Sequence, residues 1–376
     1  MVQELKCKVA IIGGGPAGCI CAYYLQNNFD VTVFDKKSLL HTILPTGGGR
    51  CNLAHAQYDY RELASNYPRG EKFLYSVFSK FSTLDTIEFF KNIGVNTYIQ
   101  DDERIFPISN SSKDVRDKFL KSLNKIKVVH EEVLRINNGF SIVTDKNAYK
   151  ADYVVISIGG HVSYELIKLL GHKIIEPKPS LTGLVTEEDF SSISGVAINN
   201  LLFTHRGISG PAIYRISSLK ARDSFPYKLK FNFLDGVDLQ KELDQNSHKS
   251  IKNLLGSYIP KSFAVFILNS ILINPDTKCH SINGIMRDNI SNKLQNFEVT
   301  VIGTFPEGEV VTSGGVDLKE INPKTMESKL HPKIYFCGEV LDIDGFCGGF
   351  NLQNCWSTGF VASHSIINNP SSILYQ

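Results

Sequence analysis

The first hydrophobic run of the chain is short and continuous. Residues 8–12 contain Val, Ala, Ile and Ile in succession, which is typical of a strand covered on both faces. Residues 16–28 then have helical character, and residues 31–34 form a second short hydrophobic run. The pattern predicts a strand, a helix and a second strand, the order found in a βαβ unit.

The following part of the chain alternates between helical and strand-like patterns. Helical spacing covers about residues 70–93 and 111–125, on either side of a strand-like segment at 103–107. Residues 127–135 predict one further strand, and residues 152–160 predict a buried strand that ends in two glycines. Alternation of this kind favours an α/β fold.

The middle of the chain follows a different period. Between residues 181 and 233 the apolar segments alternate with a period of two, which suits antiparallel strands with one solvated face. Residues 238–274 have helical spacing, interrupted at Pro260, and residues 299–305 return to a strand pattern. This stretch predicts a β-rich domain with a small helical subdomain.

Composition and charge narrow the class of protein. A chain of 376 residues is too long for one compact domain, so two or three domains are expected. The net charge is +2 with both signs mixed along the chain, which argues against a nucleic acid or a membrane surface as partner. No apolar stretch is long enough to cross a membrane, and the first hydrophobic run is too short for a signal sequence. We therefore expect a soluble, cytoplasmic protein.

The cysteines do not predict a metal site. None of them lies in a CxxC pair, and no metal-ligand spacing is visible. Without export they should be reduced thiols, most of them small buried hydrophobic residues. The eight are Cys7, Cys19, Cys21, Cys51, Cys279, Cys337, Cys347 and Cys355.

A glycine fingerprint lies between the first strand and its helix. Gly13 permits a tight turn, Gly15 lets a pyrophosphate approach the backbone, and Gly18 lets the helix pack close to the strand. The helix N-terminus offers unpaired N–H groups to phosphates, and Asp35 ends the second strand where it can accept hydrogen bonds from ribose hydroxyls. The unit therefore predicts a dinucleotide site. Asp35 disfavours a 2′-phosphate, but the fingerprint does not separate NAD from FAD.

Three further glycine-rich segments are candidates for holding the far end of a cofactor. Residues 46–52 contain three consecutive glycines, which let a backbone run beside a flat ligand, followed by the donors Arg50 and Asn52. Residues 152–160 end a predicted strand at Gly159, where an open α/β sheet places its ligand. Residues 334–362 combine a strand, acids, glycines and a helix whose N-terminus would stabilise the negative charge of a reduced flavin.

Five motifs spread over the chain resemble one family. They read GGGRCN at 47–52, THRGISGPA at 204–212, TSGGV at 312–316, TMESK at 325–329 and GEVLDIDGFCGGFNLQNCWSTG at 338–359. In this order they are similar to the BaiN-like family of FAD-dependent oxidoreductases, also called YhiN-like or aminoacetone-oxidase-like flavoproteins. The matches span nearly the whole chain and are more specific than the glycine fingerprint.

The resemblance implies non-covalent FAD and a Rossmann-like, three-layer βαβ domain that is split by the insertion. We expect FAD-binding segments at 1–183 and 307–376, and a β-rich substrate domain at 184–306 with its helical subdomain at about 238–292. Residue reasoning and the resemblance together give the expected cofactor contacts: Gly13, Gly15, Pro16, Ala17, Gly18, Asp35, Lys36, Gly49, Arg50, Cys51, Asn52, Val133, Gly159, Gly338, Glu339, Asp342, Gly348, Gly349, Asn351 and Leu352.

The catalytic candidates are few. The chain has one dinucleotide fingerprint and no CxxxxC disulfide motif, so either the substrate reduces the flavin directly or NAD(P)H binds without a Rossmann unit of its own. Arg50 could bind an acidic substrate group or offset flavin charge, or only brace its loop. Cys51 could be a redox thiol, although a buried small residue is favoured. His205 is nominated as a proton shuttle, although a structural role is favoured.

Three functional hypotheses remain open. The first is an FAD-dependent oxidoreductase that passes a hydride between the flavin and a small organic substrate or NAD(P)H, as a monomer or homodimer. The second is a flavin-dependent RNA-modifying enzyme, which would require a basic patch on the insert; the scatter of Lys and Arg among acids counts against it. The third is a non-catalytic flavin redox sensor.

Overall fold

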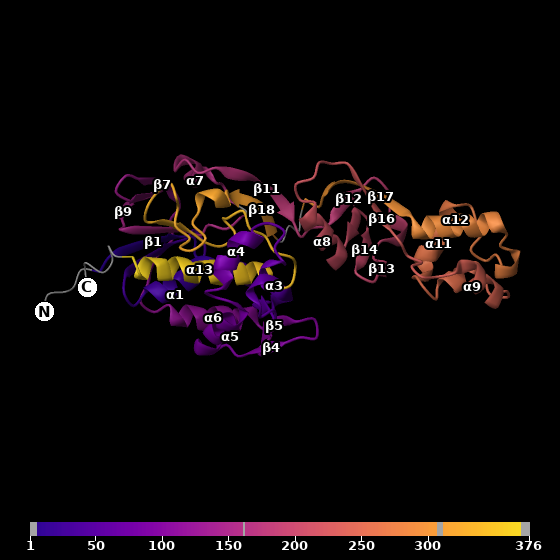
Figure 1. The fold of residues 1–376 in the computed structure, drawn as a ribbon, viewed down its shortest axis with the longest axis horizontal. Helices are drawn as coiled ribbons and strands as arrows, with labels where there is room; N and C mark the ends of the chain where they lie inside the picture. The colour runs from indigo at the N-terminus through magenta and orange to yellow at the C-terminus, as the bar shows by residue number, and fades with distance from the viewer. Residues whose placement is uncertain (1–5, 161, 307–310, 370–376) are drawn as a thin grey trace. The chain divides into compact units, whose positions relative to one another are not determined.

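The computed structural model describes residues 6–160, 162–306 and 311–369 (Figure 1). These residues form two compact units. The first unit comprises the described residues up to Lys178 together with those from Val311 onward, and the second comprises the described residues of Pro179–Val310. The expected boundary at residue 183 lies a few residues beyond the first crossing, and the expected start of the last segment at 307 lies outside the described residues.

The first unit is built on a five-stranded parallel sheet. The strand order is β19, β10, β1, β2, β6, with Ile12 of β1 opposite both Ile156 of β10 and Phe34 of β2. The continuous apolar runs form these strands because both faces of the sheet are covered. Their bounds are Ile334–Phe336 (β19), Tyr153–Ile156 (β10), Lys8–Ile12 (β1), Asp30–Phe34 (β2) and Lys127–Val129 (β6).

Helices and a meander complete the three expected layers. Helices α1 (Pro16–Leu25) and α13 (Phe350–Ile367) lie side by side (Figure 1), and a Cβ at Gly359 would lie 2.5 Å from the Ala17 carbonyl oxygen. On the sheet, Tyr149 of the meander contacts Phe34 edge to face at 5.1 Å. The meander consists of β7 (Val133–Asn137), β8 (Ser141–Thr144) and β9 (Ala148–Lys150).

Smaller elements of the first unit surround this framework. Trp356 of α13 is fully buried, with Phe90 at 5.2 Å between ring centroids. The helices are η1 (His41–Ile43), α2 (Thr46–Gly49), α3 (Tyr60–Ala64), α4 (Glu71–Phe78), α5 (Thr83–Asn92), α6 (Ser112–Ser122), α7 (Glu165–Leu169) and η4 (Leu318–Glu320). The strands are β3 (Ala54–His55), β5 (Arg104–Pro107) and β4 (Thr97–Ile99) in one sheet, and β11 (Ile174–Ser180) with β18 (Val311–Val316) in another.

Two stretches of the first unit that were predicted as single elements each form two elements in the structure. The strand predicted over 127–135 is split into β6 and β7, which belong to different sheets, because β6 pairs with β2 and β7 pairs with β8. The helix predicted over 70–93 is α4 followed by α5. The second helix starts anew because Ser82 and Asp85 form a capping box.

The second unit has an antiparallel sheet with helices packed beside it. Its core is aromatic, with Phe203 stacked on Phe263 at 5.1 Å and Phe297 close to both. The strand order is β13 (Ala197–Ile198), β14 (Leu201–Thr204), β15 (Gly207–Ser209), β12 (Leu184–Thr186), β17 (Phe297–Thr304) and β16 (Tyr227–Phe231). The helices are η2 (Ser191–Ile193), α8 (Pro211–Leu219), α9 (Leu239–Gln245), α10 (Ile251–Leu255), α11 (Lys261–Ser270), η3 (Cys279–Ser281) and α12 (Gly284–Gln295).

The predicted fold class is confirmed. The parallel sheet with its βαβ start forms the Rossmann-like domain, and the insert combines antiparallel strands with a helical subdomain. Across the described ranges, no helix has both the length and the apolar character that crossing a membrane requires.

Candidate functional site

Two glycines of the fingerprint are required by backbone packing. Gly13 has φ +105°, and a Cβ there would lie 2.3 Å from the Ser157 carbonyl oxygen at the end of β10. A Cβ at Gly18 would lie 2.0 Å from the Gly13 carbonyl oxygen. Any side chain at either position would therefore push the helix and the two strands apart.

The third glycine faces open space. A Cβ at Gly15 would have only the Thr42 hydroxyl oxygen nearby, at 3.9 Å. Gly15 is the N-cap of α1 and Pro16 opens the helix, yet no side chain caps the N–H groups of the first turn. An uncapped helix start beside a side-chain-free backbone is a site for an anion, so the observed cradle fits a dinucleotide pyrophosphate around Ala17 and its neighbours.

The acid at the end of β2 is held in a fixed orientation. One carboxylate oxygen of Asp35 accepts the Gly14 N–H at 2.6 Å, and the other accepts the Lys37 N–H at 2.7 Å. Each carboxylate oxygen keeps a further lone pair, so Asp35 can also receive ribose hydroxyls as expected. The ammonium group of Lys36, another predicted contact, pairs with the Glu132 carboxylate at 2.5 Å.

The glycine-rich loop folds as a tight turn with an open side. Gly47 and Gly48 adopt left-handed conformations inside α2, and no atom lies within 4 Å of a Cβ position at Gly48 or Gly49. Arg50 donates from Nε to the Gly47 carbonyl at 3.3 Å, and its guanidinium lies over Phe106, 4.1 Å from the ring centroid. The bracing role of Arg50 is thus present in the structure.

The next two residues of the loop are buried. Cys51 is fully buried, and this burial raises the pKa of its thiol to about 12, so the thiolate that redox chemistry needs is disfavoured. The Oδ1 atom of Asn52 is buried without a hydrogen-bond partner among the described residues. Such an orphaned acceptor fits a donor group on a bound ligand.

The segment before α13 is pinned by hydrogen bonds. Glu339 accepts the Thr312 N–H at 2.8 Å through Oε1, and Gly338 donates its N–H to the Thr358 hydroxyl at 2.9 Å. The side chain of Asn351 bonds Gly345 twice, accepting its N–H at 2.8 Å and donating to its carbonyl at 2.9 Å. The amide of Asn351 therefore shapes the loop itself.

The N-terminus of α13 meets the glycine-rich loop from the other end of the chain. Gly349, the N-cap, has φ +99°, and a Cβ there would lie 2.4 Å from the Ala54 carbonyl oxygen. The Trp356 indole donates to the Leu53 carbonyl at 3.0 Å. The predicted contacts Gly348 and Gly349 thus lie beside residues 53–55, which directly follow the loop at 49–52.

The remaining predicted contacts occupy varied positions. Val133 is half-buried at the start of β7, and Gly159 follows β10 with φ +84° and open space at its Cβ position. Asp342 donates its N–H to the Val316 carbonyl at 3.1 Å, and Leu352 is half-buried in the first turn of α13. His205, the nominated proton shuttle, lies in the second unit, exposed in the turn between β14 and β15.

Sequence reasoning missed His55 and the pair Arg69–Asp344. The imidazole of His55 contacts the Gly348 carbonyl. Arg69 binds the fully buried carboxylate of Asp344 through Nε and a terminal nitrogen. No spacing in the sequence connects residues 275 positions apart.

A serine, a histidine and a glutamate form a buried chain in the first unit. The Nδ1 atom of His172 lies 2.8 Å from a Glu320 carboxylate oxygen, and its Nε2 lies 3.0 Å from the Ser328 hydroxyl. Ser328 is buried and its oxygen already accepts the N–H groups of Leu330 and His331. The arrangement resembles a hydrolase triad only in composition, because the serine cannot meet a substrate.

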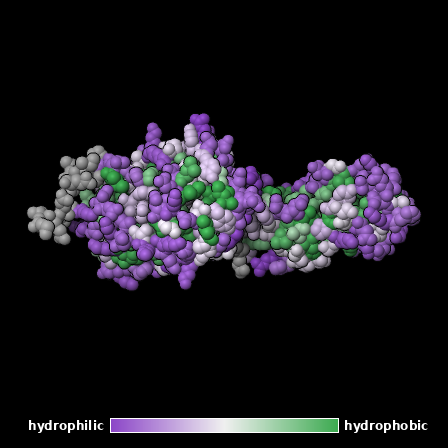
Figure 2. Space-filling view, turned by 90° about the horizontal axis from the view of Figure 1, so that it is seen from below, coloured by the Kyte–Doolittle hydropathy of each residue, from purple (hydrophilic) through white to green (hydrophobic). Residues whose placement is uncertain are grey.

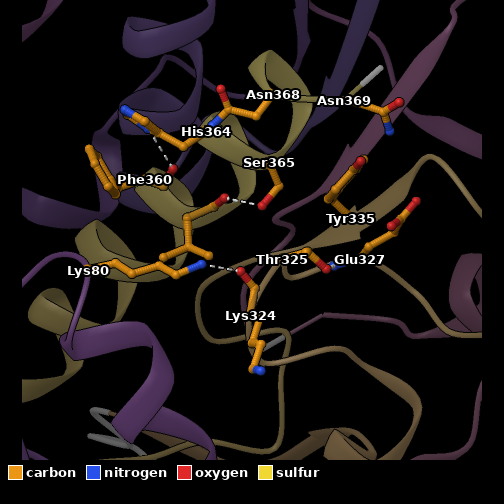
Figure 3. A pocket seen from close by; sticks show the side chains of 11 residues that line it. Lys80, Lys324, Thr325, Glu327, Tyr335, Phe360, His364, Ser365, Asn368 and Asn369 are labelled. Carbon is orange, nitrogen blue, oxygen red and sulfur yellow. Dashed lines mark hydrogen bonds between the residues drawn. The ribbon is translucent and has the colours of Figure 1, made fainter. Parts of the chain in front are cut away.

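One described cavity of the first unit lies away from the cradle. It measures about 370 Å³ and is lined at the C-terminal end of α13 by residues such as His364, Asn368 and Tyr335 (Figure 3). Helix α13 has 18 residues, so its two ends are about 27 Å apart. Lys80 on the cavity wall donates to the Lys324 carbonyl at 2.5 Å. The cavity is therefore separate from the candidate cofactor site.

The thiols follow the expectation with one exception. Cys347, directly before Gly348, is exposed, and Cys7 is half-buried, whereas the other cysteines are buried. No group of three His, Cys, Asp or Glu side chains within the described parts of the chain could hold a metal ion.

The fold and this site define the class of the protein. A parallel sheet that opens with a glycine fingerprint, with residues 53–55 against the start of α13, is the arrangement of a Rossmann-type, FAD-dependent oxidoreductase. The chain belongs to the HI0933-like family: the family described as HI0933-like protein Rossmann domain matches residues 7–365. Membership of the BaiN-like family that the motifs resemble is thereby confirmed.

Three curated relatives match nearly the whole chain. The "Ribosomal RNA dihydrouridine synthase" of Escherichia coli is 29% identical over 96% of this chain and 98% of its own length. The protein of the same name from Haemophilus influenzae is 29% identical, covering 95% of this chain and 97% of its own. The "3-dehydro-bile acid delta(4,6)-reductase" of Clostridium scindens is 27% identical over 96% of this chain and 100% of its own.

Proposed function

We propose that this protein is an FAD-dependent reductase of a carbon–carbon double bond conjugated to a carbonyl group. The observation that carries the proposal is the shared chemistry in the names of the relatives. A dihydrouridine synthase saturates the C5–C6 double bond of uracil, which is conjugated to the C4 carbonyl. A 3-dehydro-delta(4,6)-reductase acts on double bonds conjugated to a C3 ketone. One flavin reaction therefore accounts for both names.

The preferred substrate is a uridine in ribosomal RNA. The two relatives with that name come from different organisms, and each aligns with at least 95% of this chain at 29% identity. This choice reverses the preference drawn from the scattered lysines and arginines, which favoured a small molecule.

The reaction balances with NAD(P)H as the electron donor. Bound FAD would supply hydride transfer, with NAD(P)H as the donor and the carbon β to the carbonyl, C6 of uracil, as the acceptor. A proton is added at the α carbon, C5. The uracil ring gains two hydrogens, the double bond becomes single, and NAD(P)⁺ is released.

The chain itself would hold and tune the cofactor. The uncapped start of α1 at Gly15 would bind the pyrophosphate, and Asp35 would bind the ribose of the adenosine. The loop at 49–52 would lie beside the flavin, with Asn52 supplying an acceptor that has no other partner among the described residues. The N-terminus of α13 at Gly349 would stabilise the negative charge of the reduced flavin.

The catalytic roles follow from these positions. Arg50 keeps free guanidinium N–H groups after bonding Gly47, so it would act by its charge beside the flavin or the substrate. Cys51 is assigned no proton or electron transfer, because its thiol is buried and its pKa is raised to about 12. His205 remains a candidate proton donor on the insert.

The test begins with the visible spectrum of the purified protein under anaerobic conditions. A flavin spectrum should appear and should bleach when NADPH or NADH is added. An unmodified transcript of Escherichia coli ribosomal RNA should then restore the colour, and mass spectrometry of the digested RNA should find uridine heavier by two hydrogens. A transcript that neither restores the colour nor gains hydrogens would contradict the RNA assignment.

A second candidate substrate is a 3-oxo steroid with double bonds at positions 4 and 6, favoured by the 27% identical relative. It is tested in the same cuvette in place of RNA. Reoxidation by the steroid alone, with loss of its dienone absorbance, would keep the proposed reaction and change its substrate. A protein that binds FAD but is reoxidised by neither compound would contradict the proposed reaction.

A further inference from the structure

Four exposed basic side chains come together in the helical subdomain. His248 and Lys249 precede α10, whereas Lys278 and His280 lie about thirty residues later at η3. All four are exposed. We call them the basic patch. Neither segment is a run of positive charge in the sequence, so the patch exists only in the folded chain.

Backbone pairing between the two segments brings the patch together. The Cys279 N–H donates to the Lys249 carbonyl at 2.9 Å, and Ser250 pairs with Lys278 in an antiparallel bridge. The His280 N–H donates to the Ser247 carbonyl at 3.1 Å. These bonds fix the four side chains within one short two-stranded turn.

Side-chain contacts also place the two segments of the patch close together. The rings of His248 and His280 have centroids 6.4 Å apart, and Nδ1 of His280 lies 3.0 Å from the Ser247 carbonyl oxygen. Burial raises the pKa of the Cys279 thiol, and the charges of Lys249 and Lys278 both oppose that rise. Both lysines therefore lie close enough to the Cys279 thiol to influence its pKa.

The acids of the subdomain are engaged elsewhere. Asp276, the acid nearest in sequence to the patch, pairs with Lys252 at 2.7 Å. The other acids bind groups outside the patch: Asp238 caps α9, Glu242 bonds the Tyr258 hydroxyl, Asp244 accepts from Gln240, and Asp288 pairs with Arg287. Among the described residues, none of the four basic side chains has an acid within salt-bridge distance. The patch keeps its positive charge for an external anion.

The helical subdomain that carries the patch has a mostly hydrophilic surface on the face drawn in Figure 2. Figure 2 shows predominantly hydrophilic residues over the helical part of the second unit, whereas apolar residues gather over its sheet. A surface of this kind suits a polyanion better than an apolar protein partner. Lysine ammonium groups and imidazole N–H groups donate hydrogen bonds to phosphate oxygens without reading a base sequence.

We propose that the basic patch docks the phosphate backbone of the RNA substrate. The proposal rests on ribosomal RNA being the substrate of the proposed reaction and assigns the helical subdomain a role in it. Docking would position the RNA without choosing the uridine, because phosphate contacts set affinity and register and base contacts set specificity.

The test compares full-length variants. In Lys249→Glu/Lys278→Glu, the affinity for labelled transcripts covering the Escherichia coli ribosomal RNAs should fall about tenfold or more at 0.1 M salt. The slope of log affinity against log salt should decrease by about 1.4, the value for two lost contacts to a single strand. Lys249→Arg/Lys278→Arg should bind like the wild type.

The control is Lys261→Glu, which reverses one positive charge at an exposed residue outside the two paired segments. It should leave RNA affinity within about twofold, since no phosphate contact is lost. Thermal unfolding and the rate of flavin bleaching by NADPH check that each variant is folded. If the wild type forms dihydrouridine and the Glu double variant binds RNA equally well, the patch proposal is wrong and the proposed function stands. If the wild type neither binds the transcripts nor modifies them, both are overturned.

Discussion

The Nδ1 atom of His55 lies 3.1 Å from the carbonyl oxygen of Gly348, a residue 293 positions later in the chain. The imidazole also lies against Phe350, with ring centroids 4.5 Å apart. Since His55 follows the glycine-rich loop and Gly348 precedes α13, this contact joins the two segments that we assign to the flavin end of FAD. Nε2 of His55 faces Glu103 at 3.4 Å.

Replacing His55 by Ala should weaken FAD binding about fivefold to tenfold, the value of one lost hydrogen bond to a backbone carbonyl. The loss follows because the Gly348 carbonyl would no longer be anchored to the loop. FAD titration followed by flavin fluorescence measures the change. Glu103→Gln serves as the control: Glu103 is exposed, so its pairing with His55 should contribute less than about 1 kcal/mol. Equal FAD affinity in His55→Ala and wild type would contradict the anchoring role.

The fingerprint glycines should separate folding from cofactor binding. Gly15→Ala meets only open space, so the apoprotein should keep its stability within about 1 kcal/mol while FAD affinity falls about tenfold or more. Gly18→Ala would place a Cβ 2.0 Å from the Gly13 carbonyl oxygen and should destabilise even the apoprotein by about 3 kcal/mol. Urea unfolding and FAD titration of the two variants measure these effects.

A matched helix position controls for the general effect of exchanging Gly for Ala. Gly284 begins α12, and a Cβ there would have only an Arg287 nitrogen at 3.9 Å. Gly284→Ala should stabilise the protein slightly, by about 0.5 kcal/mol, and leave FAD affinity unchanged. A Gly15→Ala variant with normal FAD affinity would remove the pyrophosphate assignment from the start of α1.

Local patterns predicted most of the strands. A strand that is buried on both faces is apolar throughout, and a strand that is buried on one face alternates apolar and polar residues. The runs that became β1, β10 and β19 are continuous and apolar, and all three lie in the parallel sheet. The error at 127–135 arose because β6 and β7 are short and only three residues apart, and their pairing with different sheets is a tertiary contact. Sheet membership cannot be read from such a segment alone.

The glycines of the site could be predicted from the sequence. Side chains whose partners lie far away along the chain could not. Gly13 and Gly18 were assigned packing roles that their close approaches explain. By contrast, His55 and Arg69 have no local pattern, since their partners lie 293 and 275 residues away. The basic patch was missed for the same reason.

Breaking the Arg69–Asp344 pair should be costly. Asp344 is fully buried and the Arg69 side chain is only 12% exposed, so Arg69→Met would leave a buried carboxylate without its main cation. We expect a loss of about 3 kcal/mol in the free energy of unfolding. Trp356 is the sole tryptophan and lies buried in the first unit, so its fluorescence during urea unfolding reports this change directly.

A double-mutant cycle separates the pair from its surroundings. Arg69→Met/Asp344→Asn should be less destabilised than the sum of the two single variants, because the double variant has no unpaired buried charge. Additive losses would show that the two side chains contribute independently, and the ion pair would then have no special role in holding the segment before α13.

The stability of the first unit should decrease as the pH falls below about 6.5. Burial lowers the pKa of His172 despite the opposing carboxylate of Glu320, so the folded protein keeps this imidazole neutral where the unfolded chain binds a proton. Stability is therefore complete above the unfolded pKa and falls as the pH drops toward the folded one, by at most about 1.4 kcal/mol per pH unit. His364, whose pKa burial also lowers, should add a second contribution.

The comparison of His172→Gln with the wild type isolates the contribution of His172 to the pH dependence of stability. Urea unfolding followed by Trp356 fluorescence between pH 7.5 and about 5 should show a shallower pH dependence in His172→Gln, since one of the two proton-binding differences is gone. His205→Gln, at an exposed residue of the second unit, should keep the wild-type slope. A His172→Gln protein that loses stability as steeply as the wild type would mean that His172 is protonated in the folded state, with Glu320 outweighing the cost of burial.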